Sequence, residues 1–248
     1  MNTATAETVS AKEKLIVALD FENADDALRL YGELRDDAGM FKVGSQLFTT
    51  AGPDLVRRLV QDGARIFLDL KFHDIPNTVA NAAREAVRLG VALFNIHAAG
   101  GSEMMRRAAE ATAEEAARLG VETPSLIAVT VLTSIDEEAM SETGVAAASV
   151  EEQVRRLARL ADASGLDGVV ASPHEIAPVR EAVGRNGFLV VTPGVRPSAV
   201  ANEDQKRVTT PAEAVRRGAD FIVVGRAILG APDPAAAARA LVNELENG

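Results

Sequence analysis

Eight short apolar segments recur along the chain, and this repeat constrains the fold more than any other feature. The segments are rich in Val and Ile and show little strict alternation, as expected for parallel strands that are buried on both faces. They cover residues 15–20, 41–44, 66–71, 93–97, 126–131, 168–172, 188–192 and 221–225. The pattern predicts an α/β fold.

The segments between these strands carry apolar residues at helical spacing. We predict helices over residues 24–34, 52–61, 81–89, 103–119, 150–161, 173–183, 211–217 and 232–246. Several of these helices stop at a glycine just before the next strand, at positions 63, 90, 120, 165 and 218. Glycine accepts the left-handed conformation that ends a helix. The unit of strand, helix and glycine is therefore repeated along the chain.

Eight such units in 248 residues, with no linker-like stretch of Ser, Gly and Pro, predict a single (β/α)8 TIM barrel. We assign residues 1–13 to a polar N-terminal extension and residues 14–248 to one catalytic barrel domain. A doubly wound open sheet is the alternative, and the strand count and chain length favour the barrel. The hydrophobic content of 47% is sufficient for a large core.

Charge and composition exclude several classes of partner and site. A net charge of −10 opposes nucleic-acid binding, which needs clustered Lys and Arg to neutralise phosphates. The absence of cysteine excludes disulfides, thiolate metal sites and a cysteine nucleophile. No stretch of about 18 apolar residues occurs, and the N-terminus is polar, so we expect no signal peptide or membrane anchor. A cytoplasmic location is compatible with these features.

The densest group of charges lies at the end of the third predicted strand. Side chains in a strand alternate between faces, so Asp69 and Lys71 share one face and the neighbouring leucines share the other. If the leucines face the helices, the two charges point into the barrel mouth, where Lys42 from the preceding strand joins them. Asp74 follows on the loop. Buried charges are costly unless paired, and the position at strand ends favours an active site over a structural salt-bridge network.

A second group of candidate residues is cationic and follows strands seven and eight. TIM barrels often bind phosphate there, beside the N-terminus of a short helix. Gly225 lets the backbone approach an anion and Arg226 supplies a bidentate guanidinium, while Arg196 adds a second arginine from the neighbouring strand end. Residues 194–210 form a long polar segment that is typical of a lid or binding loop, with a disordered surface loop as the alternative.

The charged cluster matches a known motif. The pattern Asp-x-Lys-x-x-Asp, formed by Asp69, Lys71 and Asp74, resembles the hallmark of the orotidine 5'-phosphate decarboxylase suprafamily. The longer string over residues 69–79 continues with Ile-Pro-Asn-Thr and is similar to the decarboxylase branch. The keto-gulonate-phosphate decarboxylases and hexulose-phosphate synthases share the six-residue pattern but lack that continuation, and they use Mg²⁺. The resemblance covers nearly the whole chain.

The resemblance implies conversion of orotidine 5'-phosphate into uridine 5'-phosphate (UMP) and CO₂, the last step of de novo pyrimidine nucleotide biosynthesis, without a metal or cofactor. It implies Lys71 as the proton donor to C6 of the pyrimidine, with Asp69 and Lys42 completing a charge network. Asp74 and Thr78 would come from the second subunit of a homodimer. The implied substrate contacts are Asp20 and Lys42 at the ribose, Thr133 at the pyrimidine amide edge, Gln205 at phosphate and base, and Arg196, Gly225 and Arg226 at the phosphate.

Two other functions compete with this hypothesis. A Mg²⁺-dependent lyase or aldolase acting on a sugar phosphate would share the motif but not the Ile-Pro-Asn-Thr string. A non-catalytic sensor of phosphate ligands would have no need of the proton donor Lys71. His73, His97 and His174 are too scattered for a zinc site and receive no chemical role. A dinucleotide site has no support, because no Gly-x-Gly-x-x-Gly follows the first strand.

Overall fold

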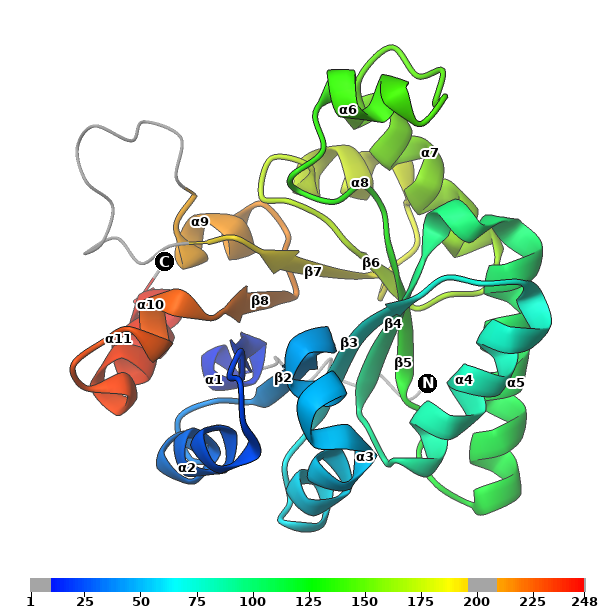
Figure 1. Ribbon diagram of the computed structural model, residues 1–248. Coiled ribbons are helices and arrows are strands. Elements are labelled where there is room, and N and C mark those ends of the chain that lie inside the picture. The colour runs from blue at the N-terminus through cyan, green and yellow to red at the C-terminus, as the bar shows by residue number, and fades with distance from the viewer. Residues whose placement is uncertain (1–9, 196–208, 248) are drawn as a thin grey trace, which may run out of the picture.

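The strands form a closed barrel. A computed structural model describes residues 10–195 and 209–247, and in it eight parallel strands pair in chain order, β8 closing onto β1. Figure 1 shows the strands at the centre with the helices around them. The strands are β1 (Leu15–Ala18), β2 (Met40–Gly44), β3 (Ile66–Phe72), β4 (Leu93–His97), β5 (Ser125–Val129), β6 (Gly168–Val170), β7 (Leu189–Pro193) and β8 (Phe221–Val224). The predicted TIM barrel is confirmed, and the strand ends differ from the predicted ones by two residues or fewer.

Helices follow every strand. They are α1 (Ala11–Lys14), α2 (Ala24–Leu34), α3 (Ser45–Gln61), α4 (Pro76–Arg88), the 3-10 helix η1 (Ala98–Gly100), α5 (Gly101–Leu119), α6 (Glu137–Glu142), α7 (Val150–Ala163), α8 (Ile176–Ala182), α9 (Pro211–Arg216), α10 (Arg226–Leu229) and α11 (Pro234–Asn247). Among the described residues, no helix is both long enough and apolar enough to cross a bilayer.

Four helices depart from the sequence-based expectation, and one of them, α6, was not predicted at all. α1 begins in the expected polar extension, where Ser10 and Glu13 form a reciprocal capping box, and ends at Lys14, one residue past its boundary. α3 begins seven residues earlier than predicted, and its break at Gly52, with φ of 68°, explains why the apolar spacing indicated only the second part. α4 begins five residues early at Pro76, whose fixed φ suits the first helical position. Thr78 therefore lies in the first turn of a helix.

The core has two layers, and the inner one positions the site. The barrel interior is filled by Ile16, Ala18, Met40, Phe67, Leu93, Ile127, Val191 and Val223, while a larger outer cluster packs the strands against the helices. Because side chains alternate along a strand, the positions two residues beyond Met40, Phe67 and Leu93 also face inward. Those positions are Lys42, Asp69 and Asn95. On β2, β3 and β4, the inward positions at the C-terminal end of the barrel are thus polar.

Candidate active site

Four charged side chains from three neighbouring strands form an alternating chain at the C-terminal end of the barrel. Lys42 Nζ lies 2.9 Å from Asp20 Oδ1 and 3.6 Å from Asp69 Oδ2. Lys71 Nζ lies 2.6 Å from Asp69 Oδ1. The order is therefore Asp20, Lys42, Asp69, Lys71, and each interior member is paired on both sides. Such pairing offsets the cost of removing the charges from water.

Asp69 is a largely buried anion that is held by two lysines and by Asn95. Its side chain is 14% exposed. Burial by itself raises the pKa of the Asp69 carboxyl, but the ammonium groups of Lys42 and Lys71 and the hydrogen bonds from Lys71 and Asn95 outweigh it, so that the pKa lies below the ordinary 3.8. Asp69 is therefore a fixed negative charge at neutral pH, and it lies directly beside the ammonium of Lys71.

The backbone of Lys71 adopts a conformation that the sequence did not indicate. Its φ of 51° is the only positive value for a non-glycine residue in the described part of the chain. The register between β3 and β4 shifts between Leu68 and Phe72, so the ladder is irregular at this point. The Lys71 N–H donates instead to Asn95 Oδ1 at 2.8 Å. Sequence reasoning missed Asn95, although a polar residue at an inward position of a buried strand was a usable signal.

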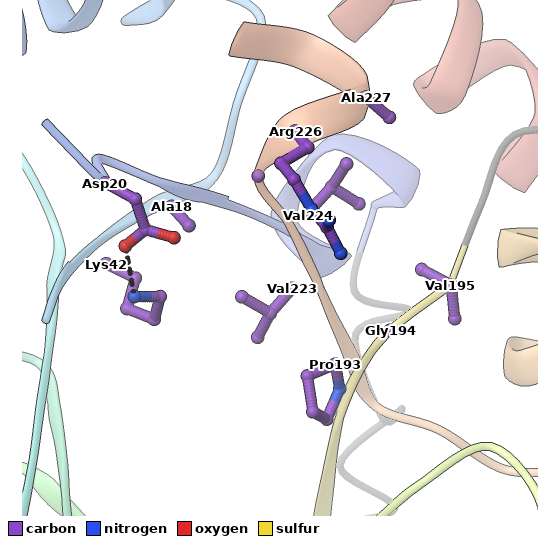
Figure 2. A pocket seen from close by; sticks show the side chains of 11 residues that line it. Ala18, Asp20, Lys42, Pro193, Gly194, Val195, Val223, Val224, Arg226 and Ala227 are labelled. Carbon is purple, nitrogen blue, oxygen red and sulfur yellow. Dashed lines mark hydrogen bonds and ion pairs between the residues drawn. The ribbon is translucent and has the colours of Figure 1, made fainter. Parts of the chain in front are cut away.

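The charged chain lies in a cleft with two lobes that share Lys42, Pro193 and Val223. The wider lobe, about 480 Å³, is also lined by Asp20, Gly194, Gly225 and Arg226 (Figure 2). The narrower lobe, about 230 Å³, is lined by Asp69, Lys71, Thr133 and Ser172 together with apolar side chains from β3, β5 and β6. The reactive charges and the candidate phosphate site thus line two neighbouring lobes that share three residues.

Arg226 provides the cationic end of the wider lobe. Figure 2 shows its side chain extending from the end of β8 toward the segment that carries Gly194. The guanidinium is exposed, and no carboxylate among residues 10–195 and 209–247 pairs with it. A Cβ on Gly225 would lie 3.4 Å from the Cβ of Ala18 and 3.5 Å from Asp20 Oδ2, so the backbone there is close to β1. A guanidinium that has no carboxylate partner among these described residues is suited to an anionic ligand.

Several predicted site residues are separate from the cluster in this chain. Asp74 is exposed, and its carboxylate accepts a hydrogen bond from the N–H of Ile75 at 2.6 Å rather than reaching Lys71. Thr78 is also exposed on α4. Arg196 and Gln205 lie outside the described residues. The sequence placed Asp74 beside Lys42, Asp69 and Lys71. Within one chain, the second carboxylate of this cluster is instead that of Asp20.

Two histidines stand beside the cluster. The rings of His73 and His97 are 5.4 Å apart between centroids. Burial, followed by the nearby His73 and Lys71, lowers the pKa of His97 below 6.5, which keeps its imidazole neutral at neutral pH. In the part of the chain that the structure describes, no three His, Asp or Glu side chains are grouped so that they could hold a metal ion.

Comparison with known proteins identifies the family. The family model "Orotidine 5'-phosphate decarboxylase / HUMPS family" matches residues 13–241. The orotidine 5'-phosphate decarboxylase of Moorella thermoacetica is 57% identical over 95% of this chain and 93% of the relative, and that of Geobacter sulfurreducens is 55% identical over 96% and 98%.

Solved structures agree with the sequence comparison. The crystal structure of orotidine 5'-phosphate decarboxylase from Lactobacillus acidophilus has a TM-score of 0.83 and 40% identity, covering 93% of this chain and 98% of its own. The decarboxylase from Pyrococcus horikoshii has a TM-score of 0.75 and 26% identity over 94% and 99%. With a family model over most of its length and relatives above 50% identity, this chain belongs to the orotidine 5'-phosphate decarboxylase / HUMPS family.

Proposed function

We propose that this chain converts orotidine 5'-phosphate into UMP and CO₂. The observation that carries the proposal is the two-lobed cleft, with Lys71 and Asp69 in one lobe, Arg226 in the other and Lys42 in both. A nucleoside monophosphate has matching parts: an anionic phosphate for Arg226, ribose hydroxyls for Asp20 and Lys42, and a planar base for the narrower, mostly apolar lobe.

Lys71 is the proposed acid. The reaction breaks the bond between C6 of the pyrimidine and its carboxylate, which leaves as CO₂ while the electron pair stays on C6. The Lys71 ammonium donates a proton to C6, and the resulting amine regains one from water. An ammonium is suited to this step because it both stabilises a developing carbanion and protonates it. Asp69 orients the Lys71 ammonium through their ion pair, and Lys42 pairs with the second oxygen of the Asp69 carboxylate.

The remaining substrate contacts are assigned from the residues that line each lobe of the cleft and from the family resemblance. Thr133 lines the narrower lobe and is the proposed partner of the pyrimidine amide edge. Gly225 and Arg226 are the proposed phosphate contacts, and Asp20 accepts from a ribose hydroxyl. Arg196 and Gln205, which lie outside the described residues, are proposed at the phosphate on the grounds of the family resemblance, Gln205 also reaching the base.

We also propose that two copies of the chain share each active site. Asp74 and Thr78 are exposed at the start of α4, and between them Ile75 is 67% exposed. An exposed isoleucine rimmed by polar residues is typical of a protein–protein interface, and a second subunit would cover it. Asp74 would then reach the ribose in the site of the partner. A location in the cytoplasm is the setting that this pathway suggests.

The names of the relatives favour the decarboxylase over the competing functions. Relatives at 54–57% identity over at least 95% of this chain are named orotidine 5'-phosphate decarboxylase, whereas the family description also includes the HUMPS branch. A sensor without catalysis is disfavoured by the intact pair of Lys71 and Asp69, since binding alone does not require a proton donor.

The test is turnover by purified protein in EDTA. We expect loss of the substrate's absorbance together with appearance of UMP on chromatography. If the protein is inactive in EDTA but cleaves a ketose phosphate when Mg²⁺ is added, the metal-dependent lyase replaces this proposal. Tight binding of UMP without any product would identify the sensor instead.

A further inference from the structure

Asn95 is the buried polar side chain that touches both members of the Lys71–Asp69 pair. It lies on β4 and is 0% exposed. Its Nδ2 donates to Asp69 Oδ1 at 2.7 Å, and its Oδ1 accepts from the backbone N–H of Lys71 at 2.8 Å. Because one end of the amide donates and the other accepts, a flipped amide would lose both bonds. The orientation of Asn95 is therefore determined by its two contacts.

The bond to Lys71 supports an uncommon backbone conformation. Non-glycine residues seldom adopt a positive φ, and such residues persist only where the surroundings fix them. At Lys71 the β3–β4 register is shifted, and the N–H is satisfied by the side chain of Asn95. Without that acceptor the N–H would be left unpaired beside a buried strand, and the backbone would be free to return to the extended region. The ammonium would then leave its present position.

We infer that Asn95 is a positioning residue for decarboxylation, which holds the Lys71 backbone and the Asp69 carboxylate in the geometry that proton transfer requires. The inference rests on the proposed function. Asn95 is not among the residues that line either lobe of the cleft, so it acts through its two neighbours. A misplacement of about 1 Å at a reacting group costs about 10²-fold in rate. Loss of Asn95 therefore affects kcat more than substrate binding, which depends on the distant Arg226.

The pH dependence separates positioning from simple packing. The charged and titratable groups around Asp69 are Lys42 on β2, Lys71 on its own strand, Asp20 beyond Lys42, and His97 on β4. Asn95 adds a neutral donor that favours the charged form of Asp69. In Asn95→Ala that donor is absent, so the pKa of Asp69 rises and the acid limb of the rate profile moves to higher pH.

Asn95→Asp is expected to change the alkaline limb of the pH–rate profile. The new carboxyl has the same shape and can still accept from the Lys71 N–H, but its other oxygen meets Asp69 Oδ1. The two carboxyls then share a proton with a raised apparent pKa. When that proton is present, the variant reproduces the donor of the native amide. We therefore expect the activity of Asn95→Asp to be restored at acidic pH and lost as the pH rises.

The experiment compares the wild type with Asn95→Ala, Asn95→Asp and Val169→Ala. Val169 is equally buried on β6 but faces the helices, so its substitution controls for a cavity in the barrel wall. For each protein, kcat, KM and their pH profiles with orotidine 5'-phosphate are measured, together with the melting temperature. We expect kcat of Asn95→Ala to fall about 10²-fold with little change in KM, and the two Asn95 variants to shift opposite limbs of the profile.

The outcomes are distinguishable. If the wild type does not turn over orotidine 5'-phosphate, the proposed function fails before Asn95 is tested. If the wild type is active and both Asn95 variants keep its pH profile, the inference is overturned while the function stands. An equal loss of kcat in Val169→Ala would also overturn it. Should Asn95→Ala not fold, the acid rescue of the isosteric Asn95→Asp decides alone.

Discussion

The ammonium of Lys71 lies 2.6 Å from the carboxylate of Asp69 although both project from one strand. Strand geometry places their side chains on the same face, and the left-handed backbone at Lys71 together with Asn95 fixes how they meet. The pair lines the narrower lobe of the cleft, whereas the candidate phosphate contact lies in the wider one. Chemistry and binding are thus assigned to separate groups of residues, and each can be tested alone.

Removal of the proposed acid should separate turnover from binding. In Lys71→Ala we expect kcat to fall by at least about 10²–10⁴-fold, the usual contribution of a positioned acid. UMP affinity, measured by calorimetry, should stay close to that of the wild type because Arg226 is untouched. Lys12→Ala, on α1 before the first strand, serves as the control. Equal loss of binding and turnover in Lys71→Ala would contradict the assignment.

Removal of the proposed phosphate contact should weaken binding and also slow turnover. A hydrogen bond to a charged group contributes about 1.5–3 kcal/mol, so we expect Arg226→Ala to lower kcat/KM by about 10- to 100-fold. Part of the loss should be in kcat, since binding energy from remote groups is used at the reacting centre. Steady-state kinetics measure both constants, with Arg239→Ala, which removes an exposed ion pair with Asp37, as the control. A kcat at saturation equal to that of the wild type would refute the coupling.

Removal of Lys42 should shift the acid limb of the pH–rate profile. Burial raises the pKa of Asp69, but the ammonium groups of Lys42 and Lys71 lower it more. In Lys42→Met one of those opposing charges is absent, so the pKa of Asp69 rises and activity is lost at a higher pH as the solution is acidified. Asp20→Asn, which removes the other partner of Lys42, should not move this limb upward. A limb at the wild-type position in Lys42→Met would show that Asp69 does not control it.

A shared active site predicts complementation between inactive variants. Mixed dimers of Lys71→Ala and Asp74→Ala, isolated through two different affinity tags, should each contain one site without either defect. We expect about half of the wild-type activity per dimer, since one of two symmetric sites is intact. Mixed dimers of Lys71→Ala and Asp69→Ala are the matched control, because each site then carries one defect and stays inactive. Absence of activity in the first mixture would place Asp74 outside the partner's site.

Local pattern was enough to predict the fold and the inward set of charges. Apolar segments of strand length, helices between them and glycines at the helix ends indicated eight units, and the closed barrel confirms them. Alternation along β3 predicted that Asp69 and Lys71 share a face, since this period depends on the strand alone. The predicted helix boundaries were wrong where glycine or proline lies within or at the start of a helix, as at Gly52 within α3 and at Pro76 at the start of α4.

The partners within the site depended on contacts between distant segments. Closure of the barrel brings β8 beside β1 and so places Gly225 next to Asp20. The positive φ of Lys71 is fixed by an acceptor on a different strand, 24 residues away in the chain. Periodicity along one strand determines which face a side chain occupies. Which donor meets which acceptor is decided only when the barrel closes, because hydrogen bonds depend on distances of a few ångström between strands.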